Sequence, residues 1–406
     1  MKEHSGHDVS PVFRPARLGS LELRNRVIRS GAYEGMCVDN GPSPDLVRHH
    51  RDLAAGGVGL TTVAYCAVSA GGRTFERQMF IRPGIVPRLR EVTDGVHAAG
   101  GSASLQLGHC GSFSRNRDVP PGFPRGPSFG INRYGLLSGL PVGRAMTRDD
   151  VARTAGDFGD AAAMARESGF DAVELHLGHG YLLSQFLSPA ANRRTDRYGG
   201  SLENRLRFAQ EALARVREAV GADFPVLAKT NLADGFAGGL GIDEAVEVAR
   251  RLQSAGVTAL VLSGGFVSRT PFFLLRGDNP LKDMIEVEES RLHRVALRLF
   301  GPAVVRSYPF KEMFFLDLAR RVREAVSMPL VLLGGIVSLD NMESALEDGF
   351  DFVCLARALI HDPNFVNRLK AGEVRRSACD HCNRCIAEMD RPGGVRCVLP
   401  LEGEGA

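Results

Sequence analysis

The sequence lacks the features that would place it in several large classes of protein. No apolar run reaches membrane length and the first ten residues are polar, so we expect neither a membrane-spanning helix nor a signal peptide, and we expect a cytoplasmic protein. Positive and negative charges nearly balance, with 50 Lys and Arg against 47 Asp and Glu, and no basic cluster is interleaved with aromatic residues. This balance argues against a nucleic acid as partner.

A further absence concerns nucleotide binding. No G-x-G-x-x-G motif with an acidic residue downstream opens a strand–helix–strand unit, so we expect no separate Rossmann site for a nicotinamide cofactor. What the chain does contain is 44% hydrophobic and 24% charged residues over 406 positions. This composition is typical of a globular protein with one large barrel or two domains.

Eight short apolar runs alternate with longer stretches of helical composition, several of which end in Gly. The alternation predicts an α/β fold of the (β/α)₈ type, a TIM barrel, with a doubly wound sheet as the alternative. The predicted strands are Val27–Ile28, Gly59–Val63, Ala103–Leu107, Ala172–Leu175, Val226–Ala228, Ala259–Leu262, Leu330–Leu333 and Phe352–Leu355. The predicted helices are Pro44–Ala55, Ile85–Ala99, Arg148–Ser168, Leu202–Val220, Ile242–Ser254, Lys311–Val326, Leu339–Glu347 and Pro363–Lys370.

Three segments decorate this predicted barrel. Residues Val12–Val27 predict an N-terminal hairpin that turns at Gly19 and Ser20 and closes one end of the barrel. Two inserted loops, Asn116–Arg144 after the third strand and Phe266–Pro309 after the sixth, follow strand ends where a barrel builds its active site. We therefore expect these two loops to cover the substrate.

The stretch from Asp171 to Phe208 carries the densest functional signal. A short buried strand leads to His176, and His179 and Tyr181 follow with glycines between them, so the backbone can bend and bring two imidazoles and a phenol together. Such a group suits a carbonyl-binding acid/base site. The alternative is that the histidines are core or metal-supporting residues and the tyrosine is a buried aromatic. A long polar loop follows and ends at a helix for which Ser201 is the predicted N-cap.

The same stretch resembles the signature of the Old Yellow Enzyme family of FMN-dependent oxidoreductases. It matches H-x-x-[HN]-x-Y-L followed by FLSP, N-x-R-x-D-x-Y-G-G-S and ENR. The resemblance implies that NAD(P)H reduces FMN, and that the flavin then passes hydride to the β-carbon of an activated alkene in a ping-pong cycle. It implies that His176 and His179 hold the carbonyl oxygen and that Tyr181 protonates the α-carbon. The substrate does not follow, because some members act on amines, nitro compounds or quinones instead.

Further candidate residues lie at the ends of the other predicted strands. Backbone N–H groups at Gly334–Gly335 and Ala356–Arg357 suit a phosphate, with a pair of simple tight turns as the alternative. The resemblance implies that this phosphate belongs to FMN, that Gln106 bonds its pyrimidine edge, and that Lys229 places a cation near N1 and O2, where many members have Arg. The full predicted cofactor set is Ser30, Gly31, Ala32, Ala64, Tyr65, Gln106, Lys229, Gly334, Gly335, Ala356 and Arg357.

Four of the eight cysteines, Cys379, Cys382, Cys385 and Cys397, are bunched near the C-terminus. In a reducing compartment such bunching indicates metal, and three outcomes stay open: a [4Fe-4S] cluster, a structural Zn²⁺ or unligated thiols. The segment resembles the cluster motif of the 2,4-dienoyl-CoA reductase and trimethylamine dehydrogenase branch, in which the third cysteine comes one residue later. We expect two parts, an FMN-binding barrel of residues 1–371 and a Cys-rich extension of residues 372–406 packed on it.

The leading interpretation is an FMN-dependent NAD(P)H oxidoreductase of the ene reductase type that acts on a small-molecule substrate. One alternative is an iron–sulfur flavoprotein dehydrogenase or demethylase, and another is a non-catalytic docking protein with zinc on a degenerate barrel. The pyridine-nucleotide and flavodoxin-like domains that follow the barrel in that branch are not found here, so we expect a cluster to take electrons from another protein or from the flavin. The sequence leaves open whether the chain forms a homo-oligomer or binds an electron-transfer partner.

Overall fold

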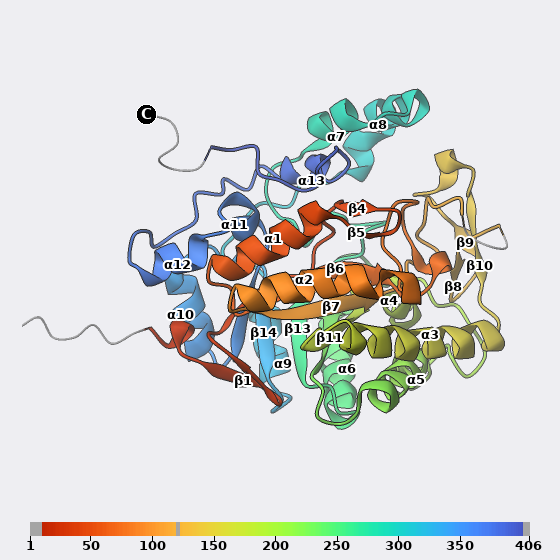
Figure 1. Ribbon diagram of the computed structural model, residues 1–406. Coiled ribbons are helices and arrows are strands. Elements are labelled where there is room, and N and C mark those ends of the chain that lie inside the picture. Colours follow the sequence, from red (N-terminus) through yellow and green to blue (C-terminus); the bar gives the residue numbers. More distant parts are fainter. Residues whose placement is uncertain (1–9, 119–121, 401–406) are drawn as a thin grey trace, which may run out of the picture.

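The protein is built around a closed barrel of parallel strands. The structure, a computed structural model, describes residues 10–118 and 122–400 (Figure 1). The strands follow one another around the barrel in the order β3, β6, β7, β11, β12, β13, β14 and β15, and β15 pairs with β3 to close it. Their bounds are Val27–Arg29 (β3), Leu60–Ala67 (β6), Ser102–Gly108 (β7), Ala172–Leu177 (β11), Val226–Asn231 (β12), Ala259–Ser263 (β13), Leu330–Leu333 (β14) and Phe352–Leu355 (β15). The predicted (β/α)₈ barrel is confirmed.

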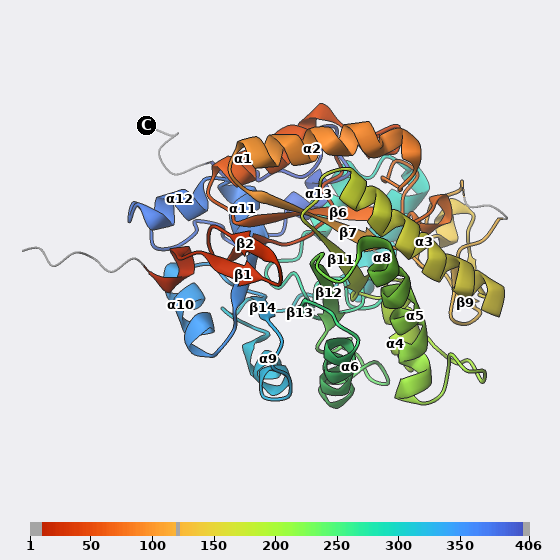
Figure 2. The same ribbon diagram turned by 60° about the horizontal axis from the view of Figure 1, so that its bottom comes forward.

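Helices between the strands form an outer layer around the barrel, as the rotated view shows (Figure 2). Local sequence signals set their ends. Thr147 and Asp150 form a capping box at the start of α3 (Arg148–Glu167), and the Ser201 hydroxyl accepts a backbone N–H at the start of α5 (Leu202–Val220), as predicted. The other helices of this layer are α1 (Pro44–Ala55), α2 (Val86–Ala98), α6 (Ile242–Ser254), α9 (Leu316–Arg323), α10 (Leu339–Glu347), α11 (Arg357–His361) and α12 (Phe365–Lys370).

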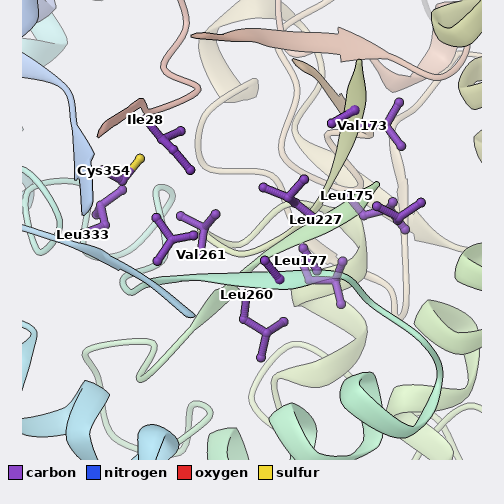
Figure 3. Close-up of a cluster of buried hydrophobic side chains, with 14 of the residues drawn as sticks. Ile28, Val173, Leu175, Leu177, Leu227, Leu260, Val261, Leu333 and Cys354 are labelled. Atoms are coloured by element: carbon purple, nitrogen blue, oxygen red, sulfur yellow. The ribbon is translucent and has the colours of Figure 1, made fainter. Parts of the chain in front are cut away.

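The barrel strands are buried on both faces because side chains fill the barrel on one side and helices cover the other. In β11, Val173, Leu175 and Leu177 alternate with Glu174 and His176, and every residue of the strand is buried. Alternation therefore places the apolar side chains on one face and the polar ones on the opposite face. Figure 3 shows buried apolar side chains from several barrel strands packed into one core. Truncating one such leucine to alanine costs about 2–5 kcal/mol.

Some barrel strands run further than their apolar runs predict. His176 lies within β11 and Lys229 within β12, and the two residues are paired across these strands, so both belong to the barrel wall rather than to the loops beyond it. Ala64 and Tyr65 likewise lie within β6. Apolar runs mark only the part of a strand that packs in the core, whereas backbone pairing continues where the side chains face a polar site.

The helical predictions differ from the structure at the start of α9 and at several short helices. Helix α9 begins at Leu316 rather than at Lys311, because Met313 has a φ of +47° and donates its N–H to the carbonyl of Gly335. A left-handed residue interrupts a helix, so this segment is a turn fixed against the loop after β14. The short helices α4 (Leu182–Leu187) and α11 are not predicted by the sequence, because they are too short to show helical periodicity.

Several smaller elements decorate the barrel. The predicted hairpin forms between β1 (Ala16–Leu18) and β2 (Leu21–Leu23), with Leu18 paired to Leu21 across the turn. The insert after β7 contains a small sheet and the insert after β13 contains two helices. The small sheet consists of β8 (Arg125–Gly126), β9 (Gly130–Ile131) and β10 (Val142–Ala145), and the two helices are α7 (Leu281–Val287) and α8 (Arg291–Val304). The remaining elements are β4 (Cys37–Val38), β5 (Gly41–Pro42) and α13 (Cys385–Glu388), with 3₁₀ turns at Pro11–Phe13, Ala70–Gly72, Pro83–Ile85 and Leu136–Ser138.

The C-terminal segment lies over loops at the carboxyl ends of the strands. The N–H of Ser377 donates to the carbonyl of Val337 after β14, and the N–H of Val395 donates to the carbonyl of Glu34 after β3. The second contact leaves no room for a side chain, because a Cβ on Gly394 would lie 2.4 Å from the Glu34 oxygen. In the parts of the chain that the structure describes, no helix is long and apolar enough to span a bilayer.

Candidate active site

The predicted histidine pair and tyrosine lie together at the carboxyl end of β11. The imidazole rings of His176 and His179 meet edge to face with centroids 4.9 Å apart, and the Tyr181 ring centroid is 4.6 Å from that of His176. Tyr65 from β6 and Phe113 from the loop after β7 pack against Tyr181, with centroids 5.0 and 6.1 Å away. The fold therefore surrounds two imidazoles and a phenol with aromatic rings from neighbouring elements.

A strained turn directs these side chains. His179 has a left-handed backbone with a φ of +59°, and Gly180 follows at +76°. A Cβ on Gly180 would lie 2.4 Å from the ring of Phe266, so only glycine fits there. The side-chain carbonyl of Asn231, at the end of β12, holds the turn by accepting the N–H of His179 at 3.0 Å. Backbone strain of this kind persists only where the surroundings fix it, and it is concentrated at functional sites.

A buried glutamine that the sequence does not single out joins this turn to the loop after β7. The Nε2 atom of Gln185 donates to the carbonyls of Gly180 at 2.7 Å and Cys110 at 2.9 Å. Its Oε1 atom accepts the N–H of Ser112 at 3.0 Å. The signal for this residue is a single amide inside the apolar segment LLSQFL, because a buried polar side chain needs partners.

The histidines and the tyrosine are all neutral near pH 7. Burial, then the neighbouring His179 and Lys229, hold the pKa of His176 well below its usual range, and burial and Lys229 lower the pKa of His179 to about 3. Burial raises the pKa of Tyr181 above its usual value, so the phenol keeps its proton. The three side chains can therefore donate hydrogen bonds to a ligand without carrying charge. Nδ1 of His176 has no hydrogen-bond partner in the described part of the chain.

A second polar group lies beside the first, on β7, β11 and β12. Gln106 donates through Nε2 to Oε1 of Glu174 at 2.6 Å, and Nζ of Lys229 lies 3.0 Å from the same oxygen. Lys229 also donates to Oγ of Ser30 and to the carbonyl of Gly31, each at 3.2 Å. Four predicted cofactor residues are thus linked, directly or through Lys229, to the carboxylate of Glu174, which the sequence does not single out. Its signal is a charged residue inside a fully buried apolar strand, where a carboxylate requires partners.

The small residues predicted to contact a cofactor lie beside this group. A Cβ on Gly31 would come within 3.1 Å of the Ala64 Cβ, so the loop after β3 passes close to β6. The carbonyl of Ala32 accepts a hydrogen bond from Arg29, whose guanidinium also pairs with the buried carboxyl of Glu34 at 2.6 Å. This buried ion pair, which is not predicted from the sequence, ties the loop to the end of its own strand.

Tyr65 and His109 complete the polar lining on the side of β6 and β7. The Tyr65 hydroxyl lies 2.8 Å from Oγ1 of Thr74, so Tyr65 meets Tyr181 with its ring rather than with its hydroxyl. Nδ1 of His109 accepts the N–H of Gly111 at 3.0 Å, and burial lowers the pKa of His109 to about 4. Both side chains are therefore held by the protein itself.

The two loops predicted to hold a phosphate lie side by side, because β14 pairs with β15. Gly334 and Gly335 have φ values of +107° and +76°, and a Cβ on Gly335 would lie 2.7 Å from the carbonyl oxygen of Lys311. The guanidinium of Arg357 reaches the Cys-rich segment instead, where it donates to Oδ1 of Asn383 at 2.6 Å. Because the Arg357 side chain is engaged with Asn383, the groups suited to an anion at these loops are the backbone amides rather than the guanidinium.

The clustered cysteines lie near this arginine. Arg357 interacts electrostatically with Cys379, Cys385 and Cys382, and none of the four clustered thiols is in a disulfide. Sγ of Cys397 lies 3.4 Å from Nδ1 of His361. Across residues 10–118 and 122–400, no group of three or more His, Cys, Asp or Glu side chains is arranged as a metal site. The donors are of the kind that zinc or an iron–sulfur cluster needs, but the thiols are not gathered into a coordination shell.

More than half of the chain matches one protein family. Residues 11–265 match the NADH:flavin oxidoreductase / NADH oxidase family. The chain belongs to this family. Membership confirms the resemblance to Old Yellow Enzyme and makes the protein an NAD(P)H-dependent flavin oxidoreductase, since FMN and NAD(P)H are the cofactors of the family. It also favours an enzyme over the non-catalytic docking protein.

Individual members of the family and related folds are similar over most of the chain. This chain is 39% identical over 394 residues to 4,4'-dithiodibutanoate disulfide reductase of Rhodococcus erythropolis, and the match covers 96% of this chain and 94% of the relative. It is 30% identical over 384 residues to NADH oxidase of Thermoanaerobacter brockii, covering 92% of this chain but 52% of the relative, so it spans about half of that protein. The old yellow enzyme homologue from Zymomonas mobilis has the same fold, with a TM-score of 0.70, 22% identity, and coverage of 91% of this chain and 96% of that one.

Proposed function

We propose that the protein reduces an activated alkene of the enone type, with NAD(P)H as reductant and FMN as the bound cofactor. The observation that carries the proposal is the contact between two neutral imidazoles and a phenol, His176, His179 and Tyr181, at the carboxyl end of the barrel strands. Active sites of (β/α)₈ barrels lie at this end. The NAD(P)H donor and the acceptor then use the same site in turn, which gives ping-pong kinetics.

The residues around Glu174 and the loops after β14 and β15 fit FMN. Backbone amides at Gly334–Gly335 and Ala356–Arg357 suit its phosphate, because β14 and β15 place them side by side. Gly31 lets the loop after β3 pass close to Ala64 and Gln106, and Gln106 offers an amide to the polar edge of the flavin ring. When bound, FMN supplies the hydride chemistry that amino-acid side chains lack.

Each residue of the site has a role that follows from its hydrogen bonds. We assign the carbonyl oxygen of the acceptor to His176, because its buried Nδ1 has no partner and a buried polar atom is stabilised by gaining one. Nε2 of His179 is engaged with Ser263, so His179 contributes through its other nitrogen. Negative charge that develops on the oxygen is stabilised by these donors. Tyr181 holds its proton and delivers it to the α-carbon.

Similarity to a disulfide reductase over 94% of that protein favours a second candidate acceptor, an organic disulfide. Its reduction takes up two electrons and two protons, breaks the S–S bond and gives two thiols. The residues would act in the same places, with Tyr181 protonating the thiolate that leaves and the imidazoles donating hydrogen bonds to its sulfur. The two candidate acceptors differ at His176. An enone brings a carbonyl oxygen to this residue, whereas a disulfide has only sulfur to accept its hydrogen bond.

We also propose that Cys379, Cys382, Cys385 and Cys397 bind one metal centre, a [4Fe-4S] cluster with zinc as the alternative. Four thiols in one short segment supply a full donor set. Burial raises the pKa of Cys382 to about 11 and that of Cys385 to about 12, and the charge of Arg357 opposes the shift at Cys385 only in part, so metal binding must displace the thiol protons. If the centre is an iron–sulfur cluster, the dehydrogenase or demethylase activity of the related branch becomes the alternative function.

The two half-reactions of the purified protein test the proposed function. An absorption spectrum establishes whether flavin is bound, and anaerobic titration with NADH and then NADPH establishes the reductant. The reduced protein is then mixed with a cyclic enone or with a dialkyl disulfide that carries carboxylates. Faster reoxidation by the enone supports the alkene reductase, and faster reoxidation by the disulfide supports the second candidate. Absence of bound flavin, or reoxidation by neither compound above the rate with oxygen alone, would overturn the proposal.

A further inference from the structure

A buried carboxylate joins the two side chains that face the proposed flavin site from β7 and β12. Glu174 is 1% exposed, and its Oε1 atom lies 2.6 Å from Nε2 of Gln106 and 3.0 Å from Nζ of Lys229. The three residues come from neighbouring strands of the barrel, and Glu174 is directly paired with Gln106 in the register of β11 and β7. The contact is therefore built into the barrel wall rather than into a loop.

Glu174 fixes which way the amide of Gln106 points. A carboxylate accepts hydrogen bonds and does not donate them, so the amide must turn its NH₂ group toward Glu174. The carbonyl oxygen of Gln106 then points away from Glu174. A hydrogen-bond acceptor is thereby presented to a cofactor at this position, and the amide cannot reverse without placing two acceptors against each other.

Glu174 also limits what Lys229 can do. An ammonium group has three N–H donors. Lys229 donates two hydrogen bonds, to Oγ of Ser30 and to the carbonyl of Gly31, each at 3.2 Å, and its Nζ forms an ion pair with Oε1 of Glu174 at 3.0 Å. The carboxylate of Glu174 therefore offsets the charge that Lys229 presents to a cofactor.

We propose that Glu174 is a positioning residue that orients Gln106 and offsets the charge of Lys229, and that it thereby weakens the preference of the site for reduced over oxidised FMN. This inference rests on the proposed FMN site. Reduced flavin is anionic, so an unbalanced lysine would bind it more tightly than the balanced pair does. The pair keeps the reduced cofactor a stronger hydride donor.

The test is the reduction potential of the bound flavin, measured by anaerobic spectroelectrochemistry on the holoenzyme. Glu174→Gln keeps the size of the side chain and removes its charge. We expect the ratio of the dissociation constants of reduced and oxidised FMN to fall about tenfold, which raises the two-electron potential by about 30 mV. Lys229→Met should change the ratio in the opposite direction, and the double variant Glu174→Gln/Lys229→Met should lie between the two single variants.

Ser104→Ala is the matched control. It removes a buried polar atom without a partner from β7, two residues from Gln106, and changes no charge. We expect its potential to equal that of the wild type. An unchanged or lowered potential in Glu174→Gln, or an equal shift in Ser104→Ala, would overturn the role of Glu174. Failure of the wild-type protein to bind FMN would instead overturn the proposed function.

Discussion

Nε2 of His179 lies 2.7 Å from Oγ of Ser263, whereas Nδ1 of the adjacent His176 has no hydrogen-bond partner within residues 10–118 and 122–400. The two imidazoles, which look equivalent in the sequence, therefore differ in what they can offer a ligand. His176 has a free buried nitrogen, and one nitrogen of His179 is already engaged with the strand β13.

This difference predicts unequal effects of removing each ring. His176→Ala should weaken binding of a carbonyl ligand by up to about tenfold, the value of one hydrogen bond, and should slow reoxidation of the flavin further, because the interaction strengthens as charge develops on the oxygen. His179→Ala should have the smaller effect on binding. Titration of the flavin absorbance with an unreactive carbonyl ligand measures this. Ser263→Ala serves as control, because it removes the hydroxyl that contacts Nε2 of His179 and leaves both imidazoles in place. Equal losses in the two histidine variants would contradict the assignment.

Tyr181 is predicted to act in one half-reaction only. Tyr181→Phe keeps the ring that packs on Tyr65 and His176 and removes the proton. Flavin reduction by NAD(P)H needs no proton from the phenol, so its rate should stay nearly unchanged, while enone reduction should slow by about 10²- to 10⁴-fold. Stopped-flow traces of the separate half-reactions decide the matter. A comparable loss in flavin reduction would show that Tyr181 is not the donor.

The loop after β14 is predicted to tolerate no acidic side chain. Gly335→Asp should expel FMN, because its Cβ meets the carbonyl of Lys311 and its charge repels the phosphate. Gly372→Asp is a matched control, since Gly372 also has a left-handed backbone, with a φ of +72°, but a Cβ there meets no atom within 4 Å. Flavin content per chain after gel filtration measures the effect. Full retention by the Gly335 variant would refute the phosphate assignment.

The four clustered cysteines are predicted to act as one site. Changing any of Cys379, Cys382, Cys385 or Cys397 to Ser should release the metal and loosen the C-terminal segment, since ligation contributes to folding it. Metal analysis of anaerobically purified protein, combined with limited proteolysis of the segment, measures both effects. Cys37→Ser is the control, because Cys37 is a free thiol outside the cluster. Neither iron nor zinc in the wild-type protein would refute the metal site.

Acid should destabilise the fold through its neutral buried histidines. The pKa of His179 is about 3 and that of His109 about 4, below the usual value, so the unfolded chain binds more protons between these values and about pH 6.5. Stability therefore falls as the pH decreases through this range, by up to about 1.4 kcal/mol per pH unit for each histidine. His179→Asn should flatten the slope by about that amount. Urea unfolding of both proteins from about pH 4 to about pH 7 measures the slope, and identical slopes would contradict the prediction.

The sequence by itself determines the alternation of strands and helices, whereas the pairing of β15 with β3 decides that the sheet closes into a barrel. The strands contain apolar runs and several helical stretches end in Gly, and because both signals are local the order of the elements can be read from the sequence. The group of His176, His179 and Tyr181 is also local, because six residues and one strained turn contain it. Strand ends such as Lys229 are less evident, since polar side chains at the site interrupt the apolar pattern while backbone pairing continues.

What only the tertiary structure decides is the pairing of residues that are far apart in the chain. Glu174 meets Gln106 across 68 positions and His179 meets Ser263 across 84. No spacing in the sequence encodes these contacts, because they depend on the register of adjacent parallel strands and on the side chains alternating between the two faces of each strand. The register is set by packing around the whole barrel. It determines which polar groups of the site already have partners and which remain free to bind a ligand.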